Sequence, residues 1–325
     1  MADSSLQEQL TKYLTDAHSI EEQALAQLEA APRIAGDPEL AGIFQEHLGE
    51  TRGHESMTRT RLEALGADTS TIKDMVMKAG GAGFLLFAKS QPDTPGKLVA
   101  HAYSYEHMEL AAYELLGRVA ERAGDEETVQ LAKAIRDQEQ AMAERLASNF
   151  DRSVAASLED VGREDMLEQL RTYLADAHAI EAQAIKLLEK GPELASDPEL
   201  SSLFEEHLVE TRDQQELVDA RLEALGGEPS MLKDLAMKAG AINWGTFFAA
   251  HPDTPGKLVA FAYAFEHLEI AGYEQLRRVA EQVGDGETAD MAARILEQER
   301  NAAEKLAASF DRAVEASLRA QGITA

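Results

Sequence analysis

Apolar residues recur at helical spacing along most of the chain, and in each half they mark out four long amphipathic segments. The first predicted helix begins at a capping box formed by Ser5 and Glu8. Its apolar stripe consists of Leu10, Leu14, Ala17, Ala24 and Leu28. The pattern therefore predicts an all-α protein.

Proline and glycine mark the boundaries of the other segments in the first half. Asp37 and the proline after it predict the start of the second helix, and Thr94 with its proline predicts the start of the third. Gly124 should close the third helix, and Asp125 should open the fourth. The expected inward positions are Leu40, Ile43 and Met57, then Val99, Ala102, Tyr113 and Leu116, then Ala132, Ile135, Met142 and Leu146.

The connections between the predicted helices indicate the topology. Short loops join helices one and two, and helices three and four, so each pair should form an antiparallel hairpin. Roughly thirty residues separate helices two and three, enough to return along a bundle about 40 Å tall. This wiring predicts a ferritin-like four-helix bundle with a long crossover, in which we expect a short helix over 72–78 and an apolar stretch over 84–87.

The two halves of the chain repeat each other without a gap. A shift of 160 residues sets Tyr13 over Tyr173, and YLTDAHSIEEQAL over YLADAHAIEAQAI. A repeat covering several helices indicates duplication of a whole domain. We therefore expect two tandem bundles, residues 1–160 and 161–325, with the boundary near Gly162. Their matching faces should pack as a pseudo-twofold pair.

Composition restricts the chemistry of the chain. Cysteine is absent, which leaves His, Asp and Glu as the candidate metal ligands. The formal charge of −28 argues against nucleic acid or an anionic membrane as a partner and favours cations. No long apolar run and no secretory signal pattern is found, which predicts a cytoplasmic protein.

Acidic and histidine residues interrupt the predicted inward stripe of every helix. In the first half they are Glu21, His47, Glu50, His54, Glu106, Glu109 and Glu139. In the second half the same places hold Glu181, His207, Glu210, Gln214, Glu266, Glu269 and Glu299. Since residues equidistant from a hairpin turn lie level, each set should converge on one layer of its bundle.

Burying so many carboxylates needs compensation, and on the first half's stripes the only basic side chain is Arg61. Either the acids share protons, or a divalent metal neutralises them. A mixed Glu and His shell suits iron or manganese, with zinc the weaker candidate. Simpler interpretations remain for single residues: acids at the core edge, Glu106 outside the ligand shell, His18 and His107 as hydrogen-bonding histidines, and Tyr113 as a core aromatic.

Several motifs together resemble the YciF and YciE family of ferritin-like bacterial stress proteins: DAHSIEEQ, then QEHLGET and EEHLVET, then EHMELAAY and EHLEIAGY. The resemblance implies a rubrerythrin-like bundle, di-metal binding and induction under stress, but no established reaction. The chain departs from the usual Glu-x-x-His pattern, because it reads His47-x-x-Glu50 and has no histidine near Glu139. One metal or a carboxylate-dominated pair per half therefore both remain open.

Two functions from different classes fit these patterns. The leading hypothesis is a metal-dependent oxidoreductase or ferroxidase that meets oxygen or peroxide at the bundle core. The alternative is a non-catalytic stress scaffold or metal buffer with a vestigial acidic core. Because His54 is replaced by Gln214, we expect the first half to bind metal more tightly.

Overall fold

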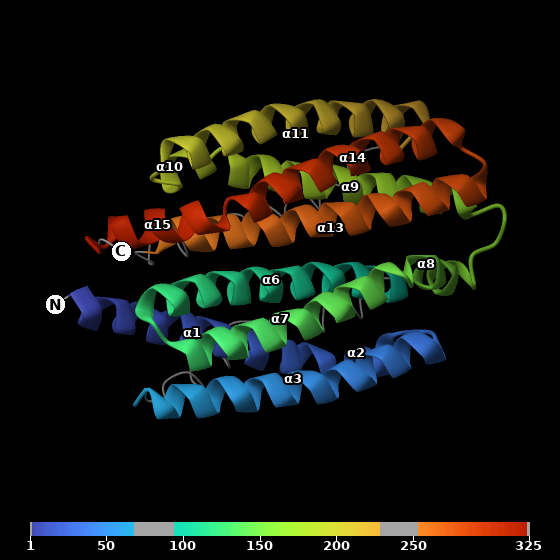
Figure 1. Cartoon of the computed structure of the whole chain (residues 1–325). Helices are drawn as coiled ribbons and strands as arrows, with labels where there is room; N and C mark the ends of the chain where they lie inside the picture. The colour runs from blue at the N-terminus through green and yellow to red at the C-terminus, as the bar shows by residue number, and fades with distance from the viewer. Residues whose placement is uncertain (1, 68–93, 228–252, 324–325) are drawn as a thin grey trace. The chain divides into compact units, whose positions relative to one another are not determined.

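The computed structural model describes residues 2–67, 94–227 and 253–323, and the regular elements in these ranges are all α-helices (Figure 1). The prediction of an all-α protein is confirmed. The features expected in the crossover, at 72–78 and 84–87, lie outside the described residues.

Contacts between helices divide the chain into two units, with the change between Glu159 and Asp160. The first unit contains α1 (Ala2–Leu28), α2 (Ala31–Ile34), α3 (Pro38–Ala64), α6 (Thr94–Ala123), α7 (Glu126–Ala147) and α8 (Phe150–Leu158). The second contains α9 (Met166–Leu188), α10 (Gly191–Leu194), α11 (Pro198–Ala224), α13 (Thr254–Val283), α14 (Gly286–Ala308) and α15 (Phe310–Ala320).

The long helices of the first unit pack in a ring, in which α1 contacts α3 and α6, and α7 contacts α6 and α3. The middle of α3 meets the middle of α6 where His47 contacts Glu106. The end of α3 meets the end of α6 where Arg61 pairs with Asp125. These two helices therefore run in the same direction, as a connection that returns along the unit requires. Helices α9, α11, α13 and α14 make the same ring of contacts in the second unit.

Local capping explains where several helices begin and end. The side chain of Asp37 accepts hydrogen bonds from the backbone N–H groups of Glu39 and Leu40, as expected of an N-cap. Gly124 follows α6 with φ of +69°, a conformation that glycine adopts without strain, and Asp125 then caps α7. The predicted start of α3, the end of α6 and the start of α7 are confirmed.

Three details of the predicted pattern are wrong. Helix α1 begins at Ala2, so Ser5 lies inside it, because no Pro or Gly stops the helix there. Met57 is 41% exposed; the inward position next along α3 from His54 is taken by Thr58. The fourth predicted helix is followed by a separate helix, α8, that was not predicted. The break falls at Ser148 and Asn149, whose side chains donate hydrogen bonds to backbone carbonyls of α7.

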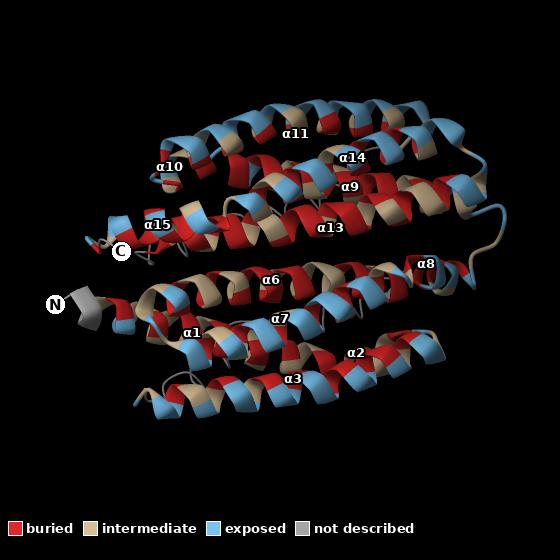
Figure 2. Ribbon diagram, in the orientation of Figure 1, coloured by how far each residue is buried: buried red, intermediate tan, exposed pale blue. Residues whose placement is uncertain are grey.

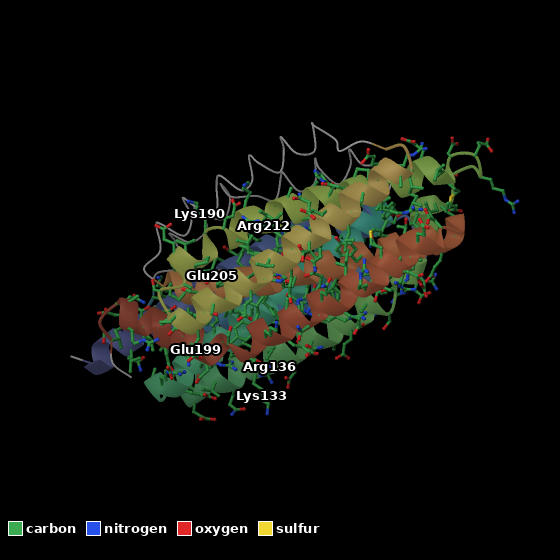
Figure 3. The ribbon with its side chains drawn as sticks, turned by 90° about the horizontal axis from the view of Figure 1, so that it is seen from above. Lys133, Arg136, Lys190, Glu199, Glu205 and Arg212 are labelled. Atoms are coloured by element: carbon green, nitrogen blue, oxygen red, sulfur yellow. The ribbon has the colours of Figure 1, made fainter. Side chains whose placement is uncertain are left out.

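The predicted apolar stripes form the core of each unit. The buried residues lie along the helix faces that meet other helices of the same unit (Figure 2). Charged side chains such as Lys133 on α7, or Glu199 and Glu205 on α11, lie on outward faces (Figure 3). No helix in the described ranges is long and apolar enough to cross a membrane. Against this pattern, the acids buried at the centre of each unit need an explanation.

Candidate metal centre

Six buried acidic and histidine side chains lie together in the interior of the first unit, and we call them the first cluster. They are Glu21 on α1, His47 and His54 on α3, Glu106 and Glu109 on α6, and Glu139 on α7. None is more than 3% exposed. The structure thus brings together six of the seven residues that the sequence singled out in this half.

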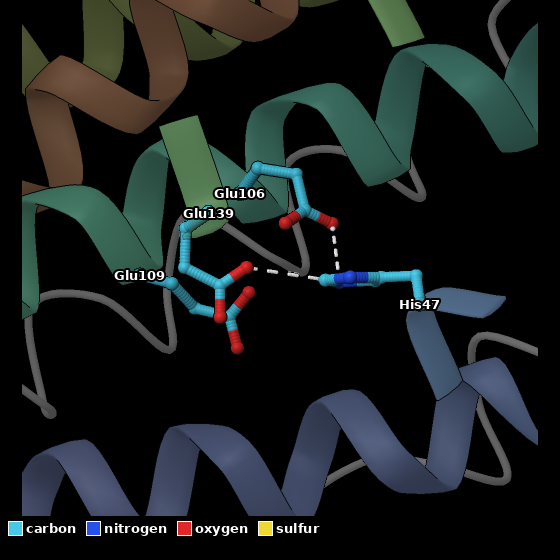
Figure 4. Close-up of side chains that lie close together, drawn as sticks. All are labelled: His47, Glu106, Glu109 and Glu139. Carbon is cyan, nitrogen blue, oxygen red and sulfur yellow. Dashed lines mark ion pairs between the residues drawn. The ribbon is translucent and has the colours of Figure 1, made fainter. Parts of the chain in front are cut away.

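The six residues form two overlapping groups of candidate metal ligands. One atom from each of His47, Glu106, Glu109 and Glu139 lies within 4.8 Å of the others (Figure 4). Glu21, His54 and Glu139 form a second group by the same measure. Glu139 belongs to both groups, so this carboxylate lies between two neighbouring ligand sets.

The histidines face the carboxylates closely. Nε2 of His47 lies 3.2 Å from Oε1 of Glu106 and 3.7 Å from Oε2 of Glu139. Nδ1 of His54 lies 2.7 Å from Oε1 of Glu139 and 3.8 Å from Oε2 of Glu21. Each imidazole therefore directs one nitrogen at two carboxylates that come from different helices.

The other nitrogen of each imidazole meets an oxygen on the outer side. Nε2 of His54 lies 2.5 Å from Oε1 of Gln138, and Nδ1 of His47 lies 3.2 Å from Oε2 of Glu50. Since these oxygens accept, the outer nitrogens carry the N–H and the inner nitrogens face the cluster. Metal-binding histidines are commonly held in this way. Gln138 was not predicted from the sequence, because it lies next to Glu139 on α7 and nothing in the residue pattern distinguishes it.

Many carboxylate oxygens in the first cluster have no hydrogen-bond partner among the described residues. They include both oxygens of Glu109 and Oε2 of Glu21, Glu106 and Glu139. Burying an ionised carboxylate without a partner costs several kcal/mol of free energy, which an ion pair or a bound cation must offset. Arg61 does not help, because it pairs with Asp125 and Glu127 at the end of the unit.

Burial and mutual repulsion govern the protonation of these groups. Burial, reinforced by the charge of Glu139, raises the pKa of Glu21 to about 8, and burial also raises the pKa of Glu106 to about 8. Burial and the neighbouring acids raise the pKa of Glu109 well above its ordinary value. The metal-free cluster therefore keeps several of its protons at neutral pH.

The histidines respond in the opposite sense to their surroundings. Burial alone would lower their pKa values, but the facing carboxylates outweigh it. The result is a pKa of about 10 for His47 and about 9 for His54. Burial would raise the pKa of Glu139, but its contacts with His54 and His47 hold it below the ordinary value.

Glu50 does not lie on the inward face where the sequence placed it. Its side chain is 50% exposed and lies outside both ligand groups. Three residues along a helix turn the side chain about 60° away from His47, which puts Glu50 at the flank of α3. It contacts the outer nitrogen of His47 and so orients that ring. The side chain of Glu210 is likewise partly exposed, at 35%, and its Oε2 lies 3.5 Å from Nδ1 of His207.

Tyr113 is a buried core aromatic, as expected, and its hydroxyl donates to Oε1 of Glu21 across 2.5 Å. Tyr273 donates to Glu181 in the second unit. His107 is also a hydrogen-bonding histidine, with Nδ1 2.7 Å from the backbone oxygen of Tyr103. The pattern did not identify Glu21 as the partner of Tyr113, because the two residues lie on different helices.

The second unit repeats the arrangement with one fewer ligand group. We call Glu181, His207, Glu266, Glu269 and Glu299 the second cluster. One atom each of His207, Glu266, Glu269 and Glu299 lies within 4.8 Å of the others. Gln214, in the place of His54, donates to Oε1 of Gln298 across 3.3 Å. Within the described residues, no group equivalent to Glu21, His54 and Glu139 is found here.

A small pocket adjoins each cluster from a different side. In the first unit it is lined by Gln27, His101, Tyr105 and Glu106, among others, and Nε2 of His101 lies 3.0 Å from Oε1 of Gln27. In the second unit it is lined by Leu188, Leu203, Phe204, His207, Glu210, Glu266, Ala302, Lys305 and Leu306. Each pocket is lined in part by a carboxylate of its cluster, Glu106 in the first unit and Glu266 in the second.

Comparison with known proteins gives the same two repeats. The family described as Domain of unknown function (DUF892) matches residues 5–159 and again residues 165–319. Protein YciF of Escherichia coli (strain K12) is 33% identical over 136 residues, which cover 39% of this chain and 79% of YciF. No solved structure gives a significant match.

Proposed function

The chain belongs to the YciF-like DUF892 family, in two tandem copies, and from this premise we propose that it binds iron or manganese at the buried cluster of each unit. The observation that carries the proposal is the set of buried carboxylate oxygens without hydrogen-bond partners among the described residues, at equivalent places in both clusters. In Glu109 and in Glu269, for example, both carboxylate oxygens lack a hydrogen-bond partner among the described residues.

Proton sharing and metal binding become two states of the same cluster. Without metal, the raised pKa values of Glu21 and Glu106 keep these acids largely neutral, and His47 holds a proton between the carboxylates. A divalent ion would take the place of those protons, which are released as it binds. The inner nitrogens of His47 and His54 and the unpartnered carboxylate oxygens are the groups that would hold it.

We further propose that the first cluster takes two ions and that Glu139 is shared between them. The support is its membership of both ligand groups. The second cluster, with one group, would hold one ion by the same criterion. The ring of four long helices, with α3 and α6 running in one direction, supports a ferritin-like arrangement for each unit.

The proposed activity is redox or ferroxidase-type chemistry with oxygen or peroxide. Iron or manganese supplies one-electron redox chemistry when bound. The chain's own residues would hold the ligands in position. Glu50 and Gln138 fix the imidazole rings of His47 and His54, and Tyr113 holds the carboxylate of Glu21. The alternative is a non-catalytic scaffold or metal buffer, which needs the same ligands but no turnover.

Metal content and melting temperature test the binding proposal. Full-length chain grown with iron or manganese should contain stoichiometric metal, and removing it should lower the melting temperature. Glu109→Gln with Glu269→Gln should abolish this shift, whereas Glu63→Gln, which changes an exposed residue of α3, should change it little. Metal-free protein from supplemented cells, with no thermal shift on adding either ion, would contradict the proposal. Consumption of Fe²⁺ under oxygen or peroxide then separates the catalytic protein from the buffer.

We also propose that the two units pair with pseudo-twofold symmetry. The support is the gapless repeat, which gives both units the same faces on one chain. Small-angle scattering of the full chain should give one compact particle; a profile of two independently moving bodies would contradict it.

A further inference from the structure

A third group of candidate ligands lies between α1 and α3 in the first unit, outside both clusters. It consists of His18, Glu22 and Glu55, each of which offers an atom within 4.8 Å of the others. His18 is 2% exposed, while the side chains of Glu22 and Glu55 are 14% and 13% exposed. The group is therefore mostly buried but reaches solvent at its acidic side.

The hydrogen bonds of Thr58 fix which nitrogen of His18 carries the proton. The Thr58 hydroxyl donates to backbone oxygens of α3, at 3.0 Å from those of His54 and Glu55. Its oxygen therefore accepts from Nδ1 of His18, 3.1 Å away. In the neutral ring, Nε2 then carries the lone pair.

That lone pair faces two carboxylates. Nε2 of His18 lies 3.9 Å from Oε1 of Glu22 and 4.0 Å from Oε1 of Glu55. Oε2 of Glu22 is buried and has no hydrogen-bond partner among the described residues. Burial lowers the pKa of His18, which favours the neutral ring. A lone pair and two carboxylate oxygens around one point repel each other, and a cation between them would remove that repulsion.

We propose that His18, Glu22 and Glu55 bind a divalent transition-metal ion of the zinc type, with water completing its coordination. One imidazole and two carboxylates form an open three-ligand set of the kind that zinc accepts. The hydrogen bond from Nδ1 to Thr58 is the outer contact that holds a ligand ring in place. The nearby cation is Arg59, whose Nη1 lies 3.2 Å from the same Oε1 of Glu55 that faces His18. It balances part of the acidic charge, so the proposed ion would share this carboxylate with Arg59.

The second unit provides an internal comparison. His178 is retained there, but Ala182 and Gln215 stand in place of the two glutamates, and Val218 stands in place of Thr58. Nδ1 of His178 lies 2.5 Å from Oδ1 of Asp219 instead. The histidine thus keeps its place while every other part of the group changes, so the proposed site belongs to the first unit alone.

The site adjoins the first cluster but does not depend on it. Glu21 and His54 face the first cluster, while their chain neighbours Glu22 and Glu55 face His18. An ion held here would lie beside the first cluster and outside both of its ligand groups. The inference holds whether or not the clusters themselves bind metal.

Cobalt titration of the full chain tests the site, because Co²⁺ is a spectroscopic substitute for Zn²⁺. Glu22→Ala with Glu55→Gln installs the residues that the second unit carries, so the fold should tolerate them. We expect this variant to bind one Co²⁺ fewer per chain in equilibrium dialysis. A matched control, Glu8→Ala with Glu63→Gln, makes the same charge change at exposed positions of the same helices and should bind as the parent does.

The two proposals can fail separately. In a chain whose clusters carry Glu109→Gln and Glu269→Gln, Co²⁺ or Zn²⁺ should still shift the imidazole ¹⁵N resonance of Nε2 of His18 and leave its Nδ1–H in place. Loss of the ion in this chain on adding Glu22→Ala and Glu55→Gln supports the site, even if the clusters prove empty. Equal metal stoichiometry and affinity with and without Glu22 and Glu55, together with an unshifted His18 signal, would overturn it, even if the clusters prove occupied.

The reverse transfer gives a second measurement. Ala182→Glu, Gln215→Glu, Val218→Thr and Asp219→Arg rebuild the group around His178, and the variant should bind one additional Co²⁺. No additional ion in a correctly folded variant would count against the proposed ligand set.

Discussion

Nδ1 of His54 lies 2.7 Å from Oε1 of Glu139, and the second unit has no equivalent contact, because Gln214 replaces the histidine. The consequence is electrostatic. Contacts with His54 and His47 hold the pKa of Glu139 below its ordinary value, whereas burial and the acids Glu266 and Glu181 raise the pKa of its counterpart Glu299 well above it. One substitution therefore separates the two otherwise matching clusters.

The first prediction is that His54→Gln weakens metal binding by the first cluster to the level of the second. An amide is a poorer ligand than imidazole, and loss of even an orienting contact costs roughly 10–100-fold in affinity. The measurement is an anaerobic competitive titration of full-length chain in which Glu269→Gln and Glu299→Gln disable the second cluster.

The converse substitution is the control for this prediction. Gln214→His, in a chain whose first cluster is disabled at Glu109 and Glu139, should raise the affinity of the second cluster. Equal affinities of the two clusters, unchanged by either substitution, would make His54 an ordinary core histidine.

A second prediction concerns the hydroxyl of Tyr113. Tyr113→Phe removes the donor to Oε1 of Glu21 and should destabilise the metal-free chain by about 1–3 kcal/mol, because a buried acceptor loses its partner. Bound metal neutralises the same carboxylate, so the loss should be smaller in the loaded protein. Urea unfolding with and without metal measures both. Tyr273→Phe is the matched variant in the second unit. Unchanged urea midpoints for both variants would show that the hydroxyls contribute nothing to the free energy of unfolding.

Repetition made most of this fold predictable from the sequence. Asp37, Gly124 and Asp125 act through local backbone chemistry, which a pattern of single residues can show. The inward stripes followed in the same way from helical spacing. The position of Met57 was wrong because Thr58 occupies the core instead, and a small polar residue gives a weak signal for burial.

The site was predictable only as far as each helix could be treated alone. Glu21, Glu109 and Glu139 were identified because acids rarely interrupt three core stripes at one level. Glu50 met the same spacing rule, yet it lies about 60° off the inward direction, a difference that depends on how α3 is rotated against its neighbours. The contact between His54 and Gln138 joins residues on different helices, so only the packed structure shows it.

The third prediction is that the pocket beside Glu106 controls exchange of metal at the first cluster. In the second unit, Leu187, Phe261 and Phe265 replace Gln27, His101 and Tyr105, which line this pocket. Installing those three apolar residues should remove most of the polar groups that line the pocket and slow loss of Co²⁺ to a chelator by a factor of roughly ten, or about 1.4 kcal/mol in the barrier.

The control for the pocket is equilibrium affinity. A residue that lines only the route to the metal changes the rates of uptake and release together, so the dissociation constant should stay nearly constant. A changed affinity at an unchanged release rate would assign these residues to the ligand shell instead.

The last prediction is that the metal-free chain loses stability as pH rises from about 5.5 to 8, while metal stabilises it more over the same range. Glu21 and Glu106 have pKa values of about 8 in the folded chain, whereas an unfolded glutamate ionises near pH 4.3. Between these values the folded state binds more protons than the unfolded state, so raising the pH favours unfolding.

The histidines act in the same direction at higher pH. An unfolded histidine loses its proton near pH 6.5, but His54 and His47 keep theirs to about 9 and 10. Their contribution to stability is therefore complete below pH 6.5 and is lost as the pH rises through 9 and 10. Bound metal takes the place of these protons, so its effect grows as they become easier to remove.

Thermal melts of chelator-treated and manganese-loaded full-length chain at pH 5.5 and pH 8 measure both trends. Glu21→Gln with Glu106→Gln should flatten the metal-free trend, because a neutral amide does not titrate. Glu109→Gln should flatten that trend as well, because burial and the neighbouring acids raise the pKa of Glu109 well above that of an unfolded glutamate, and it should also reduce the shift produced by metal. A metal-free chain that gains stability between pH 5.5 and 8, with a metal shift independent of pH, would show that these carboxyls do not hold protons in the folded core.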